Sequence, residues 1–337
     1  MNPLYRQPVR LSFTAILVVM SVSVIAGCGR GDQEYLSMGT APTTGAFYPI
    51  GTALSQVLNE HGGGQWEITA QSTNGTRENI RKLDKGELDL ALANASITYH
   101  AVRGIEGWEK KFPVQAVMTL GPNVGHFVTV EGSGITTMAD LKGKRVAVGP
   151  AGAGFEFFIK PILAAHGISY DDIRALNNTP AGSVDMLADG SADAAFLGGA
   201  MPHPSIIQAC SSLNIVFIPF DPQAREALIQ EYSFFNPITV PASAYSDLNE
   251  DFAGLNVGSI HLIVSASAEQ ELVYKITKTL WEHREDVVKK HKAGKAINEE
   301  NVARSTGTDF HPGAIRFYEE IQIWKAPGAK TAKTADE

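Results

Sequence analysis

From residue 35 onward, short apolar runs alternate with segments in which apolar residues recur at helical spacing. The first set of predicted strands covers 35–40, 66–71 and 88–93, and the helices between them cover 50–60 and 76–85. This alternation is the pattern of βα units arranged around mainly parallel sheets. The chain is therefore predicted to be an α/β protein.

A second set of strands and helices begins after the long apolar run 114–130. Its predicted strands cover 145–149, 194–197 and 215–219, and its helices cover 155–166, 183–188 and 204–211. A third apolar run, 256–265, is long enough to carry the chain back to the first set. Two sets joined by two such runs predict two lobes with a hinge, at crossings near 126–130 and 256–265.

These runs also predict the domain organisation. Residues 35–127 form the first part of lobe I, 128–255 form lobe II, and 256–325 complete lobe I with C-terminal helices. Within the last part, 269–292 is predicted to be one amphipathic helix, with acidic residues near its start and lysines near its end. Residues 326–337 have nothing to bury and are predicted to be a disordered tail.

The N-terminus predicts export. Two arginines precede an apolar stretch from 11 to 26, and residues 25–28 read Ile-Ala-Gly-Cys, the form of a lipoprotein cleavage box. We expect a lipoprotein signal peptide at 1–27, a linker at 28–34, and attachment to the bilayer through acylated Cys28. The protein would then lie in the periplasm or on the outer face of the cell envelope. An uncleaved anchor and a plain signal peptide are the alternatives, and both export the same globular body.

The net charge of the chain limits which classes of molecule can be its partners. Removing residues 1–27 takes two arginines and no acid from 28 basic and 36 acidic residues, which leaves 26 against 36 and a net charge of −10. Such an excess argues against nucleic-acid partners, because phosphate neutralisation requires clustered Lys and Arg. With Cys28 lipidated, Cys210 is the one remaining thiol, so stability must come from an ordinary core. We expect a monomer.

Three small, polar loops fall at predicted strand C-termini, where open α/β sheets bind ligands. Their candidate ligand contacts are Thr44, Phe47 and Tyr48 in loop 39–51, Ser72, Thr73, Asn74, Thr76 and Arg77 in loop 71–80, and Gly152, Ala153 and Gly154 in loop 149–155. Hydroxyls and backbone N–H groups ahead of a helix can hold an anion. Helix capping and tight turns are the alternative explanation for each loop taken singly.

Other residues near these loops are weaker candidates. Arg77 could grip a carboxylate with two hydrogen bonds, although such an Arg is often only solvated. Asn94 and Ser96 follow the strand 88–93 and are further candidate contacts. The glycines of loop 149–155 are spaced G-x-x-G-x-G, which differs from the dinucleotide fingerprint.

Catalytic motifs are missing from the sequence. It contains no H-E-x-x-H, no paired cysteines and no G-x-S-x-G. His203 and His311 are isolated, and His311 is predicted to cap or pack near the last helix, with a metal role as the alternative. We therefore expect a binding protein without cofactor or metal, not an enzyme.

Taken together, the loops resemble the TAXI family, the solute receptors of one class of tripartite ATP-independent periplasmic (TRAP) transporters. The matching segments, which cover nearly all of 35–324, are GAFYPIG, STNGTREN, GELDLALANAS, DLKGKRVAVGPAGAG, ADAAFLGGAMP, LVYKITKTL and HPGAIRFYEE. The resemblance implies a two-lobed periplasmic solute-binding-protein fold that closes on a small organic anion or amino acid. It also implies delivery of that solute to a TRAP membrane permease driven by an ion gradient.

The chain departs from this family pattern at several ligand positions. Phe47-Tyr48 stands where relatives usually show Tyr-Tyr, Ala153 replaces a serine, and Ser96 replaces a frequent aspartate. Without that aspartate an amine would lack its partner, so we expect a carboxylate without an amine. Two other functions stay open at this point: a ligand-sensing receptor partnered with a membrane kinase, and an exported enzyme with a cleft between its lobes.

Overall fold

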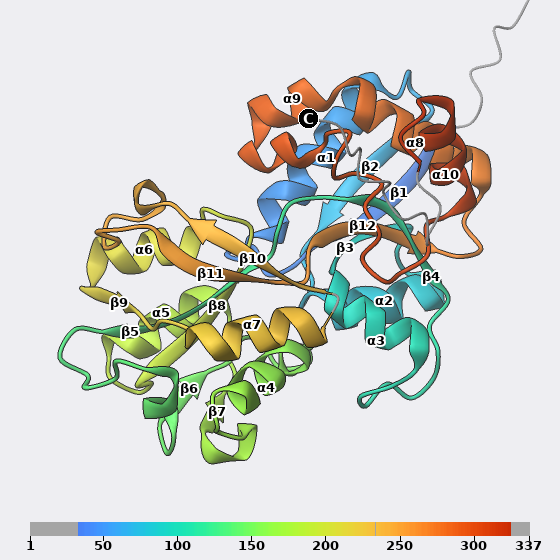
Figure 1. Cartoon of the computed structure of the whole chain (residues 1–337). Helices are drawn as coiled ribbons and strands as arrows, with labels where there is room; N and C mark the ends of the chain where they lie inside the picture. Colours follow the sequence, from blue (N-terminus) through green and yellow to red (C-terminus); the bar gives the residue numbers. More distant parts are fainter. Residues whose placement is uncertain (1–32, 233, 325–337) are drawn as a thin grey trace, which may run out of the picture. The chain divides into compact units, whose positions relative to one another are not determined.

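The computed structural model describes residues 33–232 and 234–324, and it arranges them around two mixed β-sheets (Figure 1). Sheet A has the strand order β2 (Trp66–Gln71), β1 (Glu34–Gly39), β3 (Leu90–Asn94), β12 (Ile260–Ser265) and β4 (Val114–Thr119). Strands β2, β1 and β3 are parallel, whereas β12 runs antiparallel to both of its neighbours.

Sheet B is built from the middle of the chain. Its order is β10 (Phe235–Val240), β11 (Phe252–Val257), β5 (Val124–Val130), β8 (Ala194–Gly199), β6 (Arg145–Ala147) and β7 (Arg174–Leu176), and β9 (Ile215–Phe217) pairs with β5. Only β8, β6 and β7 are parallel to one another. The predicted two-lobed α/β class is confirmed, but the sheets are mixed because the strands that cross between them run against their neighbours.

Helices cover both sheets, and their bounds are as follows. Those packed with sheet A are α1 (Phe47–His61), α2 (Thr76–Lys85), α3 (Ala95–Arg103), α8 (Gln270–Glu282), α9 (Arg284–Lys290) and α10 (Pro312–Glu320). Those with sheet B are α4 (Glu156–Ala165), α5 (Pro180–Ala188), α6 (Pro204–Ser212) and α7 (Pro222–Glu231). Short 3-10 helices are η1 (Met138–Leu141), η2 (Tyr170–Asp172), η3 (Ala242–Ala244) and η4 (Lys292–Ala296).

Local sequence explains several of these elements. Helix α2 buries Thr76, Asn79, Ile80 and Leu83, a spacing that places them on one helical face. It ends at Gly86, whose φ of 71° is a left-handed conformation that glycine adopts without strain. Strand β3 is buried at every position, because helices and neighbouring strands enclose it on all sides. His311 caps α10, as predicted, through a hydrogen bond that Gly313 N donates to its Nδ1 (3.2 Å).

The predicted helix 269–292 is wrong as a single element. It divides at His283, which ends α8 and precedes α9. The backbone there has φ −108° and ψ 25°, outside the helical range, so α9 turns away from the axis of α8 and contacts α1. Periodicity alone did not reveal this break, because the apolar spacing continues through it.

The two crossings between the sheets run side by side. Val257 N donates to Asn123 O (2.8 Å) and Ile260 N donates to Gly121 O (2.9 Å). The crossing expected near 126–130 therefore lies earlier, at 120–123, because β5 pairs with β8 from Val124 onward. The proposed lobe boundaries and hinge remain proposals.

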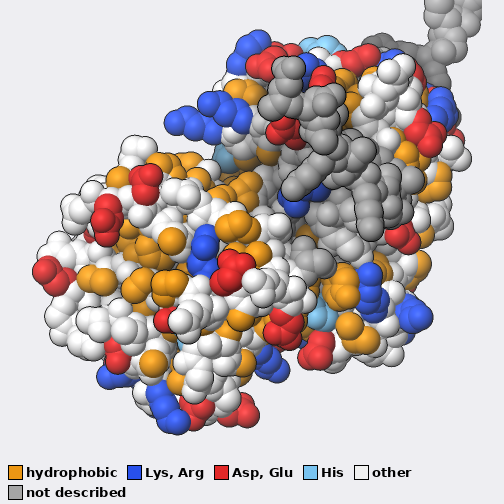
Figure 2. Space-filling view, viewed as in Figure 1, with side chains coloured by type: hydrophobic (Ala, Val, Ile, Leu, Met, Phe, Trp, Pro, Cys, Tyr) orange, Lys and Arg blue, Asp and Glu red, His pale blue; other side chains and the backbone are white. Residues whose placement is uncertain are grey.

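Several predictions concern the two ends of the chain, which lie outside the described residues. These are the signal peptide, the linker up to residue 32, the acylation of Cys28, and the tail 326–337. Among the described residues, no helix combines the length and the hydropathy needed to cross a bilayer. On the face drawn in Figure 2, acidic and basic side chains are interspersed.

Candidate ligand-binding site

A small cavity of about 30 Å³ lies between strand-end loops of sheet A and helix-start loops of sheet B. Sheet A contributes residues 41, 42, 45 and 46 before α1 and Phe47 at its start, residues 74–76 at the start of α2, and Asn94. Asn123 lines it from the crossing between the sheets, and Pro150, Phe155, Pro180 and Gly198 line it from sheet B. The cavity thus lies at strand ends, where the sequence predicts a site.

Three helices that begin at this cavity have uncapped N-termini. Helix α1 follows Ala46, α2 follows Gly75 and α4 follows Phe155, and none of these residues donates or accepts a side-chain capping bond among the described residues. In contrast, side chains cap α3, α5, α6, α7 and α10. The first-turn N–H groups of an α-helix have no partner within the helix, and its N-terminus carries partial positive charge. The uncapped N-termini of α1 and α2 can therefore hold an anion, whereas in the first turn of α4 Phe157 N and Phe158 N already donate to Gly154 O (3.2 Å) and Phe155 O (3.2 Å).

Two buried asparagines of the lining differ in their hydrogen bonding. Asn94 is a structural N-cap: its Oδ1 accepts from Ser96 N (2.8 Å), and its Nδ2 donates to the carbonyls of Val257 (3.2 Å) and Gly258 (3.0 Å). Asn123 is only 2 % exposed, yet its Oδ1 has no hydrogen-bond partner in residues 33–232 and 234–324. An unpaired buried carbonyl oxygen is unfavourable by itself, and because this oxygen accepts hydrogen bonds, Asn123 is poised for a donor group of a ligand, such as a hydroxyl.

Thr76 contributes a hydroxyl to the same lining. Its side chain is buried, and its Oγ1 accepts a hydrogen bond from Asn94 N (2.9 Å). Because that bond uses a lone pair, the hydroxyl proton remains available to a ligand oxygen.

The rest of the lining is apolar and uncharged. Phe47, Phe155, Pro42, Pro150 and Pro180 supply most of its walls, and its described residues include no Lys, Arg, Asp or Glu. An anion bound here would be neutralised by helix N-termini and amides alone, and an ammonium group would find no carboxylate.

The predicted contacts separate into two groups. Phe47, Asn74, Thr76 and Asn94 line the cavity, whereas Thr44, Tyr48, Ser72, Thr73, Arg77, Ser96, Gly152, Ala153 and Gly154 do not. Several of the second group serve the loops themselves. Ser72 Oγ donates to Ala41 O (3.1 Å), Thr73 Oγ1 donates to Thr40 O (3.1 Å), and Ser96 Oγ donates to Asn94 Oδ1 (2.6 Å).

The Arg77 side chain does not line the cavity, although the sequence suggested it as a ligand contact. Its guanidinium forms an ion pair with Glu156 (2.9 Å), donates to Gly107 O (2.9 Å), and stacks near Trp108 and Phe157. Because Arg77 lies on α2 and Glu156 on α4, the pair joins the two sides of the cavity without lining it. Ala153 is similarly adjacent, with its Cβ 3.8 Å from the position that a Cβ at Gly75 would take.

Sequence reasoning missed Asn123, Phe155 and Pro180 as lining residues. Asn123 follows Gly121-Pro122, a turn signal inside the apolar run 114–130 that could have marked the crossing. Phe155 closes the predicted loop 149–155, and Pro180 is the first residue of α5.

Three histidines are fully buried near the two sheets. Burial lowers the pKa of His126 to about 3, that of His203 to about 4 and that of His261 to about 3. His203 caps α6 by accepting from Ser205 N (3.1 Å), and His261 Nε2 lies 2.8 Å from Thr98 Oγ1. These imidazoles are neutral at physiological pH, and the two bonded ones serve the fold, whereas both ring nitrogens of His126 have no hydrogen-bond partner among the described residues.

A larger groove of about 810 Å³ lies at the β9 and β11 side of sheet B. Two carboxylates in its lining already accept backbone hydrogen bonds: Asp247 from Ile215 N (2.8 Å) and Asp251 from Ala242 N (2.9 Å). The groove is open, and these two acids are already engaged in backbone hydrogen bonds, so the smaller cavity is the better candidate despite its size.

Residues 38–321 match the family model described as the NMT1-like family. The chain belongs to the NMT1-like family. Its fold is similar to that of PhnD1 from Prochlorococcus marinus in complex with methylphosphonate, with a TM-score of 0.52, 9% identity, and coverage of 86% of this chain and 99% of that one. A binding protein component of an ABC phosphonate transporter from Pseudomonas aeruginosa gives a TM-score of 0.51, 11% identity, and coverage of 78% and 79%.

A third similar structure, from Bordetella bronchiseptica RB50, gives a TM-score of 0.51 with 12% identity over 88% of this chain and 91% of that one. At these identities the likeness shows the fold of the NMT1-like protein alone.

The resemblance to TAXI receptors of TRAP transporters is wrong. The family shown is the NMT1-like family, and the phosphonate-binding neighbour with the same fold belongs to an ABC transporter. The segments that carried the resemblance include GAFYPIG and STNGTREN, which form the glycine-containing turns into α1 and α2 together with the first residues of these helices. Such turns follow from the strand-to-helix geometry of the fold, so they do not identify a transporter class.

Proposed function

We propose that this NMT1-like protein is an extracytoplasmic receptor that binds a small organic anion in the cavity and passes it unchanged to a membrane transport component. The observation that carries this proposal is the meeting of the uncapped N-termini of α1 and α2, whose N–H groups can donate to an anion, with the buried Asn123 Oδ1, which can accept from a protonated ligand oxygen. Each offers hydrogen bonding that a ligand oxygen or hydroxyl would complete.

The lining supports an anion with a short apolar group and no amine. Uncharged donors suit a singly charged carboxylate, phosphonate or sulfonate, and the aromatic and proline walls suit an alkyl group. A relative with this fold binds methylphosphonate, which has both features. A cavity of 30 Å³ holds about two water molecules. Any larger ligand therefore requires the two sides of the cavity to separate.

The partners in this proposal are the solute, a membrane transport component and the bilayer. Transport is supported by the description of a relative as a binding protein component of a transporter. Anchoring through acylated Cys28 is supported by the residues before it, which also favour a periplasmic or outer-surface location. A binding role, in place of catalysis, is supported by an uncharged cavity lining that holds no acid-base pair.

Thermal unfolding with matched ligand pairs tests the proposal. The full-length chain in detergent is heated with methylphosphonate, propionate or ethanesulfonate, and separately with propionamide, which has the same size as propionate but no charge. A bound anion at 100 times its dissociation constant adds about 2.7 kcal/mol, which raises Tm by about 5 °C for a chain of this size. Equal shifts with propionate and propionamide would refute an anion site, and recovery of a chemically altered ligand would refute the receptor role.

A further inference from the structure

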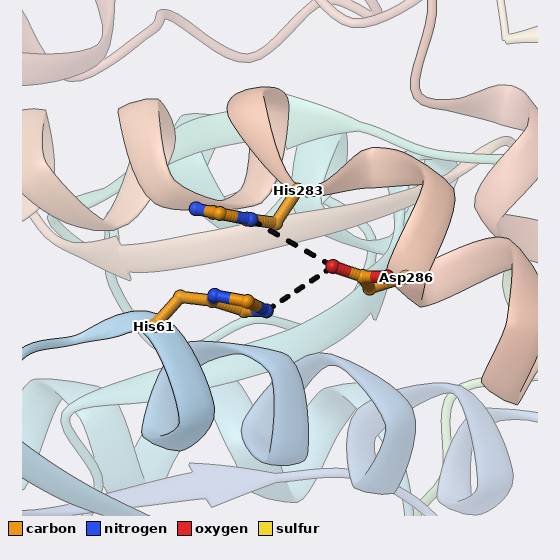
Figure 3. A group of neighbouring side chains, drawn as sticks. All are labelled: His61, His283 and Asp286. Atoms are coloured by element: carbon orange, nitrogen blue, oxygen red, sulfur yellow. Dashed lines mark ion pairs between the residues drawn. The ribbon is translucent and has the colours of Figure 1, made fainter.

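A second group of potential ligands lies on the outer helices of sheet A. His61 is the last residue of α1, His283 separates α8 from α9, and Asp286 lies in the first turn of α9. Figure 3 shows the two imidazoles facing each other, with the carboxylate beside both. One ligand atom from each of the three residues lies within 4.8 Å of the others.

The distances agree with those around a tetrahedral metal ion. Asp286 Oδ2 lies 3.1 Å from His61 Nε2 and 3.7 Å from His283 Nδ1. With Zn–N and Zn–O bonds of about 2.0–2.2 Å, two ligand atoms of a tetrahedral Zn²⁺ lie about 3.3–3.5 Å apart. The two observed separations bracket that value, so small side-chain movements would bring the three atoms into coordination range.

Helix geometry favours a cation at this place. His61 and His283 stand at the C-termini of α1 and α8, which carry partial negative charge, whereas the N-terminus of α9 carries partial positive charge and is offset by Asp286 in its first turn. Two positive side chains are close, but each already has a carboxylate partner: Lys289 with Asp286 Oδ1 (2.8 Å) and Lys290 with Glu60 (2.7 Å). Asp286 keeps its other oxygen, Oδ2, directed to the imidazoles.

One rearrangement is required. The rings of His61 and His283 stack at 3.5 Å with an angle of 10° between their planes, so their nitrogen lone pairs lie in two nearly parallel planes and do not meet at one point. A shared ion needs one ring to rotate until both lone pairs converge. His61 is exposed and lies at a helix end, which gives its ring room to turn.

We propose that His61, His283 and Asp286 form a binding site for a divalent transition-metal ion of the Zn²⁺ type, which would join α1 to the α8–α9 junction. Two imidazoles and one carboxylate are the donor set that Zn²⁺ accepts, with water completing the coordination. Ca²⁺ and Mg²⁺ prefer oxygen ligands and should not bind here.

Calorimetric titration of the metal-free, full-length chain with Zn²⁺ tests this site. One ion should bind per chain, and binding should raise the unfolding temperature. His61→Ala, His283→Ala and Asp286→Asn should each weaken binding by at least about 100-fold, more than the loss of a supporting residue around a metal. Glu285→Gln is the matched control, because it removes one charge from the adjacent residue of α9 without touching the ligand set.

Lys289→Ala separates a metal site from a simple charge cluster. Removal of its ammonium frees Asp286 Oδ1, so Zn²⁺ should bind more tightly than to the wild type. The proposal is overturned if the wild type shows no saturable Zn²⁺ binding, if the ligand variants bind as the wild type does, or if Mg²⁺ binds equally well. These outcomes are independent of the anion cavity, whose residues are unchanged in every variant.

Discussion

Replacing each of the two buried asparagines of the cavity with leucine should have opposite consequences. Leucine has the same branching as asparagine but makes no hydrogen bonds. In Asn123→Leu, the unpaired Oδ1 disappears, and a buried unsatisfied group of this kind is unfavourable by about 1–3 kcal/mol. We therefore expect the free energy of unfolding of the ligand-free protein to stay within about 1 kcal/mol of the wild type or to rise.

Asn94→Leu is the matched control. Its loss leaves Ser96 N and the carbonyls of Val257 and Gly258 without their buried partner, which should lower the free energy of unfolding by about 3 kcal/mol or more. Urea unfolding followed by circular dichroism measures both values. If the two variants lose equal stability, Asn123 is a structural residue and the reasoning fails.

Asn123→Leu should weaken ligand binding even though it leaves the protein as stable as the wild type. Asn123 Oδ1 can accept only from a ligand that carries a hydroxyl, such as the methylphosphonate monoanion. A hydrogen bond to a charged ligand contributes about 1.5–3 kcal/mol, so Asn123→Leu should weaken methylphosphonate binding by about tenfold to 150-fold and leave propionate binding unchanged. Calorimetry on a variant that is as stable as the wild type measures this loss without interference from unfolding. Unchanged affinity would remove Asn123 from the site.

Three further predictions concern pH, the contact across the cavity, and the N-terminus. Because burial lowers the pKa values of His126, His203 and His261 below their unfolded value of about 6.5, stability is present above that pH and is lost as pH falls toward 4. The slope should reach about 1.4 kcal/mol per pH unit for each histidine, and His126→Phe should reduce the total by one such increment, measured by urea unfolding at pH 7, 6 and 5. Arg77→Gln should destabilise by about 1 kcal/mol, with a similar coupling to Glu156→Gln in a double-mutant cycle, and a 100-fold loss of ligand affinity would instead indicate direct contact. Cys28→Ala should release the protein from the membrane fraction, and a wild-type mass without lipid on Cys28 would contradict acylation.

The sequence predicted the elements whose determinants are local. Helix α2 spans the predicted 76–85, because its apolar spacing and Gly86 are both visible in the chain. The predicted helix 269–292 failed because the break at His283 accompanies packing of α9 against α1, a contact between distant segments. Mixed strand directions were missed for the same reason, since β12 pairs with strands more than one hundred residues away.

The candidate site was predictable as a location and much less so as a set of atoms. The predicted loops at strand ends lie near the cavity, and Phe47, Asn74, Thr76 and Asn94 line it. The direction of a side chain depends on its tertiary partners, however. Glu156 draws the Arg77 guanidinium to α4, and Asn123 reaches the lining only because two crossings lie side by side.

A crystal structure of the protein with the best anion of the screen tests the central claim most directly. The charged group of the ligand should lie within about 3.2 Å of backbone N–H groups at the starts of α1 and α2 and of Thr76 Oγ1, and a ligand hydroxyl should donate to Asn123 Oδ1. No Lys or Arg side chain should contact it. An anion held by a lysine or arginine, or one bound away from these helix N-termini, would contradict the account.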